Sequence, residues 1–227
     1  KDLVVSSRDL WRSIQLVEKC HTMTELKEKV AERSWYWVAN YFLPERNQTP
    51  EPQLELPKGK YSIIYADPPW QYYEGGYKNQ SQHYGTMTID KLSELEVGKL
   101  AADDCILFLW ATFPILPEAI ELIAQWGFNY STVGFVWVKQ NKNGKGFFFG
   151  LGNWTRSNTE ICLIATKGSI GRKDGSISQI IYTPIGEHSK KPEIVRDKII
   201  ELVGDLPRIE LFARKKTEGW NVWGNEV

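Results

Sequence analysis

From residue 61 onward, short apolar runs alternate with amphipathic segments. The apolar runs are rich in β-branched and aromatic residues and end at turn residues, which predicts buried strands. These predicted strands cover residues 61–66, 105–112, 131–138, 159–166 and 208–213. Strands that are separated by helices form a mostly parallel sheet with helices on its faces. The pattern therefore predicts an α/β domain over residues 61–227.

Cap and breaker residues mark the predicted helices between these strands. Thr88 is placed to cap a short helix. A longer helix begins near Pro117 and ends at Gly127. Another begins at Pro192 and ends at Gly204, which is the expected order of proline and glycine at helix ends.

Residues 1–43 are predicted to form an N-terminal helical segment, and residues 44–60 a proline-rich linker. Within the first segment, Thr22-Met-Thr-Glu25 has the spacing of a capping box at a helix start. Its aromatic stretch at 35–37 is interpreted as packing. A small nucleic-acid-recognition or dimerisation module is the alternative.

The formal net charge is +0, from 28 Lys and Arg and 28 Asp and Glu. An enzyme that acts on nucleic acid usually gains affinity by neutralising phosphates. The basic residues are grouped, however, in loops that follow predicted strands. The groups are Lys139, Lys142, Lys145; Lys167, Arg172, Lys173; Lys190, Lys191; and Arg214, Lys215, Lys216. They indicate a positive rim on the ligand side, although solvated faces explain most such groups.

The cysteine pattern excludes a structural zinc site, because the three cysteines form no CxxC and no Cys/His cluster. We therefore expect no metal. Two of the cysteines lie in apolar strand-like runs and are expected to be buried free thiols. No apolar run is long enough to span a bilayer and no signal peptide is visible. We expect no membrane association and an intracellular location, in the cytoplasm or nucleoid, or in the nucleus of a eukaryote.

Residues Asp67-Pro68-Pro69-Trp70 follow the first predicted strand and carry the most informative chemistry. The Asp67 carboxylate and the Pro68 carbonyl can each accept a hydrogen bond from an exocyclic amine. The prolines hold φ fixed, so that these acceptors are in place before a substrate arrives. Trp70 offers a flat face for stacking a base. The alternative is that Asp-Pro-Pro serves only as turn chemistry at the end of a strand.

Further blocks in the same order extend this pattern to the end of the chain. They are His83-Tyr84-Gly85-Thr86-Met87, Leu107-Phe-Leu-Trp110, Trp137-Val-Lys-Gln-Asn141, Gly152-Asn-Trp154, Glu160-Ile-Cys-Leu163, Lys190-Lys-Pro-Glu193, Ile209-Glu-Leu-Phe-Ala-Arg214 and Gly224-Asn225-Glu226. With these blocks, residues 60–227 resemble the DPPW-type adenine-N6 methyltransferases related to the catalytic subunit of the eukaryotic mRNA adenosine methyltransferase. The resemblance implies a Rossmann-like class I methyltransferase sheet with an antiparallel edge. It also implies methyl transfer from S-adenosyl-L-methionine to the N6 amine of adenine in nucleic acid.

The resemblance assigns cofactor contacts to Asp67, Lys191, Arg214, Asn225 and Glu226. A G-x-G-x-x-G loop after the first strand, which many nucleotide sites use, has no good example here. The catalytic residues implied are Asp67, Pro68, Pro69 and Trp70.

Substrate contacts are expected from Tyr84, Lys139, His188 and Lys190. Tyr84 matches a position beside the target base, with packing as the alternative. Loops 71–87, 141–157 and 182–192 are expected to surround the target, which must be flipped or unpaired to react.

Other classes stay open at this point. DNA is favoured over RNA as the substrate, because the chain has neither the cysteines nor the length of the eukaryotic mRNA enzymes. A non-catalytic nucleic-acid-binding partner subunit is the main alternative to an enzyme, and methylation of another amine such as glutamine is a weaker one. The partner expected besides nucleic acid is a second copy or a related subunit, with residues 141–158 as the contact.

Overall fold

The computed structural model describes residues 22, 24–25, 55–71, 86–152, 154–186, 190–225 and 227. The chain divides into two compact units, and every described residue from 55 onward belongs to the second. In the first unit the Glu25 N–H donates to Thr22 Oγ1 at 3.1 Å, which is the bond predicted for the start of a capping box. The rest of segment 1–43, and residues 44–54 of the linker, lie outside the described residues.

Seven strands of the second unit form one sheet in the order β5-β3-β4-β2-β1-β6-β7. The strands are β1 Tyr61–Ala66, β2 Ala101–Ala111, β3 Asn129–Gln140, β4 Thr159–Lys167, β5 Ile180–Pro184, β6 Arg208–Leu211 and β7 Asn221–Trp223. The helices are α4 Ile89–Ser93, α5 Leu116–Gln125 and α6 Ile194–Val203, with short 3-10 turns η3 Val97–Lys99 and η4 Phe113–Ile115. Among the described residues, no helix is long and apolar enough to cross a bilayer.

The predicted mostly parallel sheet is confirmed, but its antiparallel strand is not at an edge. β1 pairs in parallel with β2 and β6, and β6 pairs in parallel with β7. β4 runs antiparallel between β2 and β3 in the interior of the sheet. This reversed strand corrects the prediction of a positive rim made up of all the basic groups. Because β4 is reversed, the basic group that begins at Lys167 lies at the edge opposite to the end of β1, where Lys167 donates to the Gly98 carbonyl.

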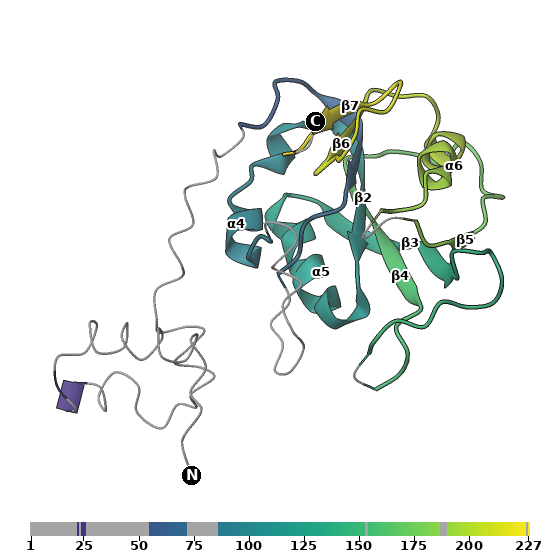
Figure 1. Cartoon of the computed structure of the whole chain (residues 1–227). Coiled ribbons are helices and arrows are strands. Elements are labelled where there is room, and N and C mark those ends of the chain that lie inside the picture. The colour runs from purple at the N-terminus through teal and green to yellow at the C-terminus, as the bar shows by residue number, and fades with distance from the viewer. Residues whose placement is uncertain are drawn as a thin grey trace, which may run out of the picture. The chain divides into compact units, whose positions relative to one another are not determined.

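Two hydrophobic cores cover the two faces of the sheet, as the alternation along each central strand requires. Ile64 of β1 and Leu107 of β2 pack with α4 and α5 on one face. Ile63 and Phe108 pack with α6 on the other. Figure 1 shows α4 and α5 on one side of the curled sheet and α6 on the other. Cys105 and Cys162 are buried free thiols on these strands, as predicted.

The helix boundaries follow the predicted cap residues. Thr88 Oγ1 accepts the Lys91 N–H at 3.2 Å and caps α4. α6 ends before Gly204, whose φ of 97° lies in the region that glycine adopts without strain. β6 ends two residues earlier than predicted, because Phe212 has a φ of 61° and turns the chain away from the sheet.

A bidentate ion pair joins α6 to β6. Arg196 Nε donates to Glu210 Oε2 at 2.7 Å, and its Nη2 lies 2.5 Å from Oε1. The guanidinium also lies over the Tyr65 ring, 5.5 Å from its centroid. Both charged side chains are about nine-tenths buried, so each depends on the other for the loss of its hydration.

Arg196→Met should therefore lower the free energy of unfolding by about 3 kcal/mol, because it leaves the buried Glu210 carboxylate unpaired. The control Lys99→Met removes an exposed pair with Glu96 and should cost less than about 1 kcal/mol. The double variant Arg196→Met, Glu210→Leu should recover most of the loss. Urea denaturation measures all three, and an Arg196→Met loss no larger than that of the control would contradict this account.

Candidate active site

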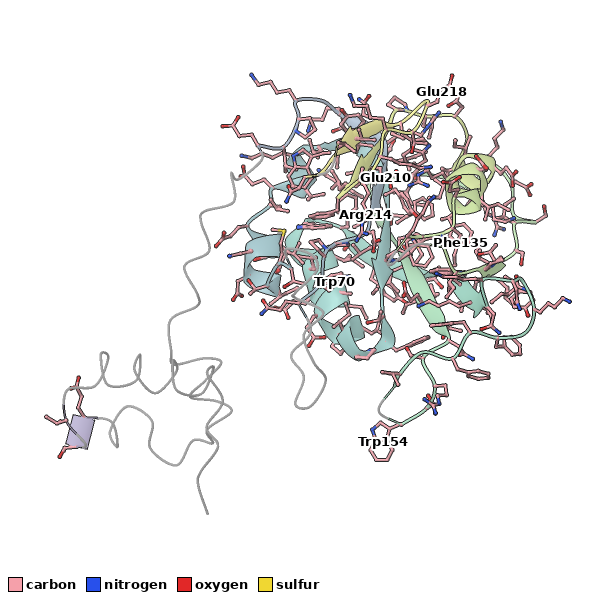
Figure 2. All side chains as sticks on the ribbon, viewed as in Figure 1. Trp70, Phe135, Trp154, Glu210, Arg214 and Glu218 are labelled. Atoms are coloured by element: carbon pink, nitrogen blue, oxygen red, sulfur yellow. The ribbon has the colours of Figure 1, made fainter. Side chains whose placement is uncertain are left out.

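The ends of three neighbouring parallel strands bring the predicted catalytic and cofactor residues to one edge of the sheet. Asp67 follows β1, Arg214 follows β6 and Asn225 follows β7. In open α/β sheets, ligands bind outside the carboxyl ends of the strands. Figure 2 shows Arg214 and Trp70 lying toward the same end of the sheet.

The backbone of the Asp67-Pro-Pro-Trp loop is held in a tight turn. The Trp70 N–H donates to the Pro68 carbonyl at 2.8 Å, and the Met87 N–H donates to the Pro69 carbonyl at 2.8 Å. A carbonyl oxygen has two lone pairs, so Pro68 keeps one for a substrate N–H. The Gln71 N–H donates to the Met87 carbonyl at 3.1 Å, which closes a second contact between the loop and the start of α4. The predicted acceptor is thus fixed in place by the chain around it.

Trp70 lies inside the protein rather than on its surface. Its indole is 8% exposed and packs in the core that α4 and α5 cover. Its Nε1 donates to the Trp110 carbonyl at 2.9 Å, at the end of β2. In this position the ring anchors the loop to the sheet, and its role in stacking a base stays a prediction.

Trp110 forms the floor of the site. It is completely buried, and its Nε1 donates to the Tyr65 hydroxyl at 2.7 Å. The Lys191 ammonium lies over its ring at 5.5 Å from the centroid, within the range of a cation–π interaction. An apolar floor of this kind keeps the charges above it poorly hydrated.

A chain of alternating charges crosses this floor. Lys191 Nζ donates to both Asp67 carboxylate oxygens, at 2.7 and 2.8 Å. The same ammonium lies 3.3 Å from Glu160 Oε2, and Lys139 Nζ lies 2.5 Å from Glu160 Oε1. Two acids and two lysines thus compensate one another at the ends of β1, β3 and β4 and ahead of α6.

Within this chain of charges, Glu160 loses its proton more readily than Asp67. Burial raises the pKa of the Asp67 carboxyl above its ordinary value, and Lys191 offsets only part of that rise. Burial opposes ionisation of Glu160 as well, but Lys191 and Lys139 together lower its pKa. Burial also disfavours the charged form of Lys191, yet Asp67 and Glu160 outweigh it and raise the pKa of that ammonium. Asp67 is therefore the more basic carboxylate, because burial outweighs its one lysine partner, whereas two lysines outweigh burial at Glu160.

The two lysines predicted to contact the substrate differ in burial. Lys139 is largely buried, and its charge is matched by Glu160. Lys190 is exposed and lies 3.0 Å from Glu193, which also contacts Lys215. Tyr84, His188 and Glu226 lie outside the described residues. The substrate roles of Tyr84, Lys139, His188 and Lys190 and the cofactor role of Glu226 stay predictions.

Arg214 and Asn225 are both exposed beyond the ends of their strands. The positive φ of Phe212 directs the chain toward Arg214. Gly224 packs so closely on this turn that a Cβ would lie 2.4 Å from the Ala213 carbonyl oxygen. Glycine is required there, and the contact fixes the place from which Asn225 leaves β7.

Glu160 is the site residue that the sequence interpretation missed. It begins a buried strand, and the register pairs it with Trp137, two residues before Lys139. An acid at the start of an apolar strand was a visible signal. Its partners depended on the antiparallel register of β3 and β4, which residue spacing does not reveal.

Comparison with known proteins places the chain in a family. The type II methyltransferase M.MunI of Mycoplasma sp is 38% identical over 194 residues, which cover 76% of this chain and 80% of that protein. The N(6)-adenine-specific methyltransferase METTL4 of Homo sapiens is 25% identical over 252 residues, or 100% of this chain and 49% of that protein. The N(6)-adenosine-methyltransferase MT-A70-like of Arabidopsis thaliana is 28% identical over 172 residues, or 74% of this chain and 24% of that protein. The MT-A70 family matches residues 61–226, and the chain belongs to this family, as the resemblance predicted.

Proposed function

We propose that this protein transfers a methyl group from S-adenosyl-L-methionine to the N6 amine of adenine in nucleic acid, with DNA as the first candidate. The predicted enzyme class, an adenine-N6 methyltransferase, is confirmed by the family and by the names of its relatives. The observation that carries the mechanism is the placement of Asp67. Its carboxylate and the Pro68 carbonyl lie in a fixed loop at the ligand edge of the sheet.

The chemical problem is that an aromatic amine is a weak nucleophile, because its lone pair is delocalised into the ring. The Asp67 carboxylate and the Pro68 carbonyl can each accept a hydrogen bond from one of the two N6–H groups. These two hydrogen bonds localise the lone pair on the nitrogen. Lys191 contacts each Asp67 oxygen once, and a carboxylate has about four acceptor positions. Asp67 therefore keeps acceptor capacity for the amine. Positioning and fixed charges of this kind supply much of an enzyme's rate enhancement.

The residues at this edge fit the proposed cofactor by their chemistry. The cofactor carries a sulfonium, an ammonium and a carboxylate, and its sulfonium supplies the activated methyl group. Asp67 offers a negative charge for the cationic part, and Arg214 offers a positive charge for the carboxylate. Asn225 provides an exposed amide for hydroxyl groups.

The charge chain supports the acceptor in two ways. Lys191 fixes the rotation of the Asp67 carboxylate, and Glu160 with Lys139 fixes Lys191. Burial, with a smaller contribution from the Glu160 charge, raises the pKa of Asp67 despite its contact with Lys191, so its carboxylate accepts hydrogen bonds more strongly. Asp67 acts as an acceptor and electrostatic guide in this proposal.

DNA is preferred to RNA because the type II methyltransferase is 38% identical to this chain, whereas the relatives whose names specify adenosine are 27–29% identical. A non-catalytic partner role is disfavoured because Asp67, Pro68, Pro69 and Trp70 are all present. Association with a second copy or a related subunit stays a prediction, which light scattering can measure.

The decisive experiment incubates the protein with isotopically labelled S-adenosyl-L-methionine and separate pools of DNA and RNA. Nucleoside mass spectrometry then identifies the product. Labelled N6-methyladenine from the DNA pool supports the proposal, and label only in the RNA pool replaces DNA by RNA. Label on another base or in neither pool would refute adenine-N6 methylation.

A further inference from the structure

The loop between β3 and β4 presents large apolar side chains to solvent. Single exposed hydrophobics are common on proteins, but a group of them marks an interaction site. The group consists of Phe147, Phe149, Leu151 and Trp154, which are 49%, 62%, 74% and 99% exposed. Figure 2 shows Trp154 at the end of this loop, pointing away from the sheet. Nothing in the catalytic proposal uses these side chains.

Backbone hydrogen bonds order the two arms of this loop. The Phe148 N–H donates to the Lys139 carbonyl at 2.9 Å, which extends the end of β3 into the loop. The Gly150 N–H donates to the Ser157 carbonyl at 3.2 Å, and the Ser157 N–H donates back at 3.4 Å. A Cβ on Gly152 would lie 2.1 Å from the Thr155 carbonyl oxygen, so only glycine permits this turn. These backbone bonds fix the two arms of the loop that carry the exposed side chains.

The base of the loop is part of the charge chain. Lys139 precedes the loop and Glu160 follows it, and Lys191 joins Glu160 to Asp67. The loop therefore starts beside the place proposed for the target adenine. The bases beside an extruded adenine have lost a stacking neighbour, and a protruding aromatic ring can replace it.

The charges of the loop identify the occupant as a polyanion. Residues 141–157 contain Lys142, Lys145 and Arg156 and no Asp or Glu. None of the three forms an ion pair with a residue that the structure describes. The cores of protein–protein interfaces are depleted in lysine, which disfavours a second protein chain as the occupant. Basic residues interleaved with aromatic rings are typical of surfaces that bind single-stranded nucleic acid.

We infer that Trp154 and Phe149 stack on the bases that flank the target adenine, while Lys145 and Arg156 contact the adjoining phosphates. This inference rests on the proposed function and adds a substrate-binding element outside the catalytic loop. Stacking tolerates any base, so the element contributes affinity and strand separation rather than sequence recognition.

The test measures fluorescence anisotropy of a short fluorescein-labelled single-stranded DNA of mixed sequence, and of the same sequence as RNA and as duplex. Trp154→Ala should raise the Kd for single strands by about 5- to 100-fold, because one stacked base is lost. Trp154→Phe should restore most of the affinity. The control Tyr130→Ala removes an aromatic ring that is 41% exposed at the start of β3, on the opposite edge, and should leave Kd unchanged. Arg156→Ala should reduce the slope of log Kd against log salt by about one.

Wild-type binding and methylation are measured first, so the inference and the proposed function can fail separately. If the wild type methylates DNA and Trp154→Ala binds it as tightly, the stacking role is overturned and the enzyme assignment stands. If Trp154→Ala changes only the mass measured by light scattering, the loop contacts a protein chain and the inference is wrong. If the wild type neither binds nor methylates DNA or RNA, both fall together.

Discussion

Replacing Asp67 by alanine should lower the turnover number by about 10³-fold or more, which is the scale of losing a fixed hydrogen-bonding partner of the reacting group. The variant keeps the Pro68 carbonyl but loses the charged acceptor at the end of β1. One N6–H then has no partner, and the amine lone pair stays delocalised. The measurement is kcat for methylation of the DNA or RNA pool that the wild type modifies.

Two controls separate this loss from damage to the fold. Asp67→Ala removes an acid whose partner Lys191 keeps its contact with Glu160, so circular dichroism should show a native spectrum. Asp67→Asn keeps one oxygen in nearly the same place but lacks the charge, and should recover only a small part of the activity. Turnover by Asp67→Ala close to that of the wild type would refute the role of Asp67.

Much of the fold was predictable because its central strands are buried on both faces. β1 and β4 contain short buried apolar stretches, and β3 carries one at residues 135–138. The cap residues locate all three helices of the second unit that the structure describes. β2 begins at Ala101, earlier than predicted. Its start was missed because Asp103 and Asp104 are polar and exposed and interrupt the apolar pattern. β5 and β7 were missed. β7 has three residues and β5 alternates exposed and buried positions at a sheet edge, so neither has the apolar content of a core strand.

The candidate site was predictable where it depended on local order and unpredictable where it depended on pairing. The position of Asp67 follows from a strand that ends in two prolines. The contact of Lys191 with Asp67 joins residues 124 positions apart, and neither the residue pattern nor the family resemblance indicated it. The reversed direction of β4 sets the partners of Glu160 and moves the Lys167 group to the opposite edge. The burial of Trp70 depends on its bond to Trp110, which the sequence does not indicate.

Replacing Lys191 by methionine should lower kcat/KM at neutral pH by about 10² to 10³-fold, the cost of removing one preorganised charge from a reacting site. The ammonium fixes the Asp67 carboxylate and shares its charge with Glu160, so both acids lose their common partner. The same change should reduce thermal stability, because the two acids repel each other at the sheet edge. Calorimetry measures cofactor binding by the variant. It separates the predicted loss of kcat/KM from an effect of weaker cofactor binding.

The charge chain also predicts the direction in which each variant shifts the pH dependence of activity. Asp67 accepts the amine only as a carboxylate, so activity falls as the pH drops through its pKa, which burial holds above the ordinary value. Lys191 lowers that pKa, and its removal should move the acid limb of the kcat/KM profile to higher pH. Glu160 raises that pKa, and Glu160→Gln should move the limb to lower pH. Opposite shifts from two neighbouring residues cannot arise from a general loss of structure.

Lys99→Met serves as the control for both variants, because that ammonium is 73% exposed beside η3 and pairs only with Glu96 among the described residues. It should change neither the acid limb nor the activity. If Lys191→Met and Glu160→Gln move the limb in the same direction, Asp67 is not the group whose ionisation limits the reaction. If neither moves it, the charge chain serves stability alone, and the acceptor role must be assigned to another group at the ends of these strands.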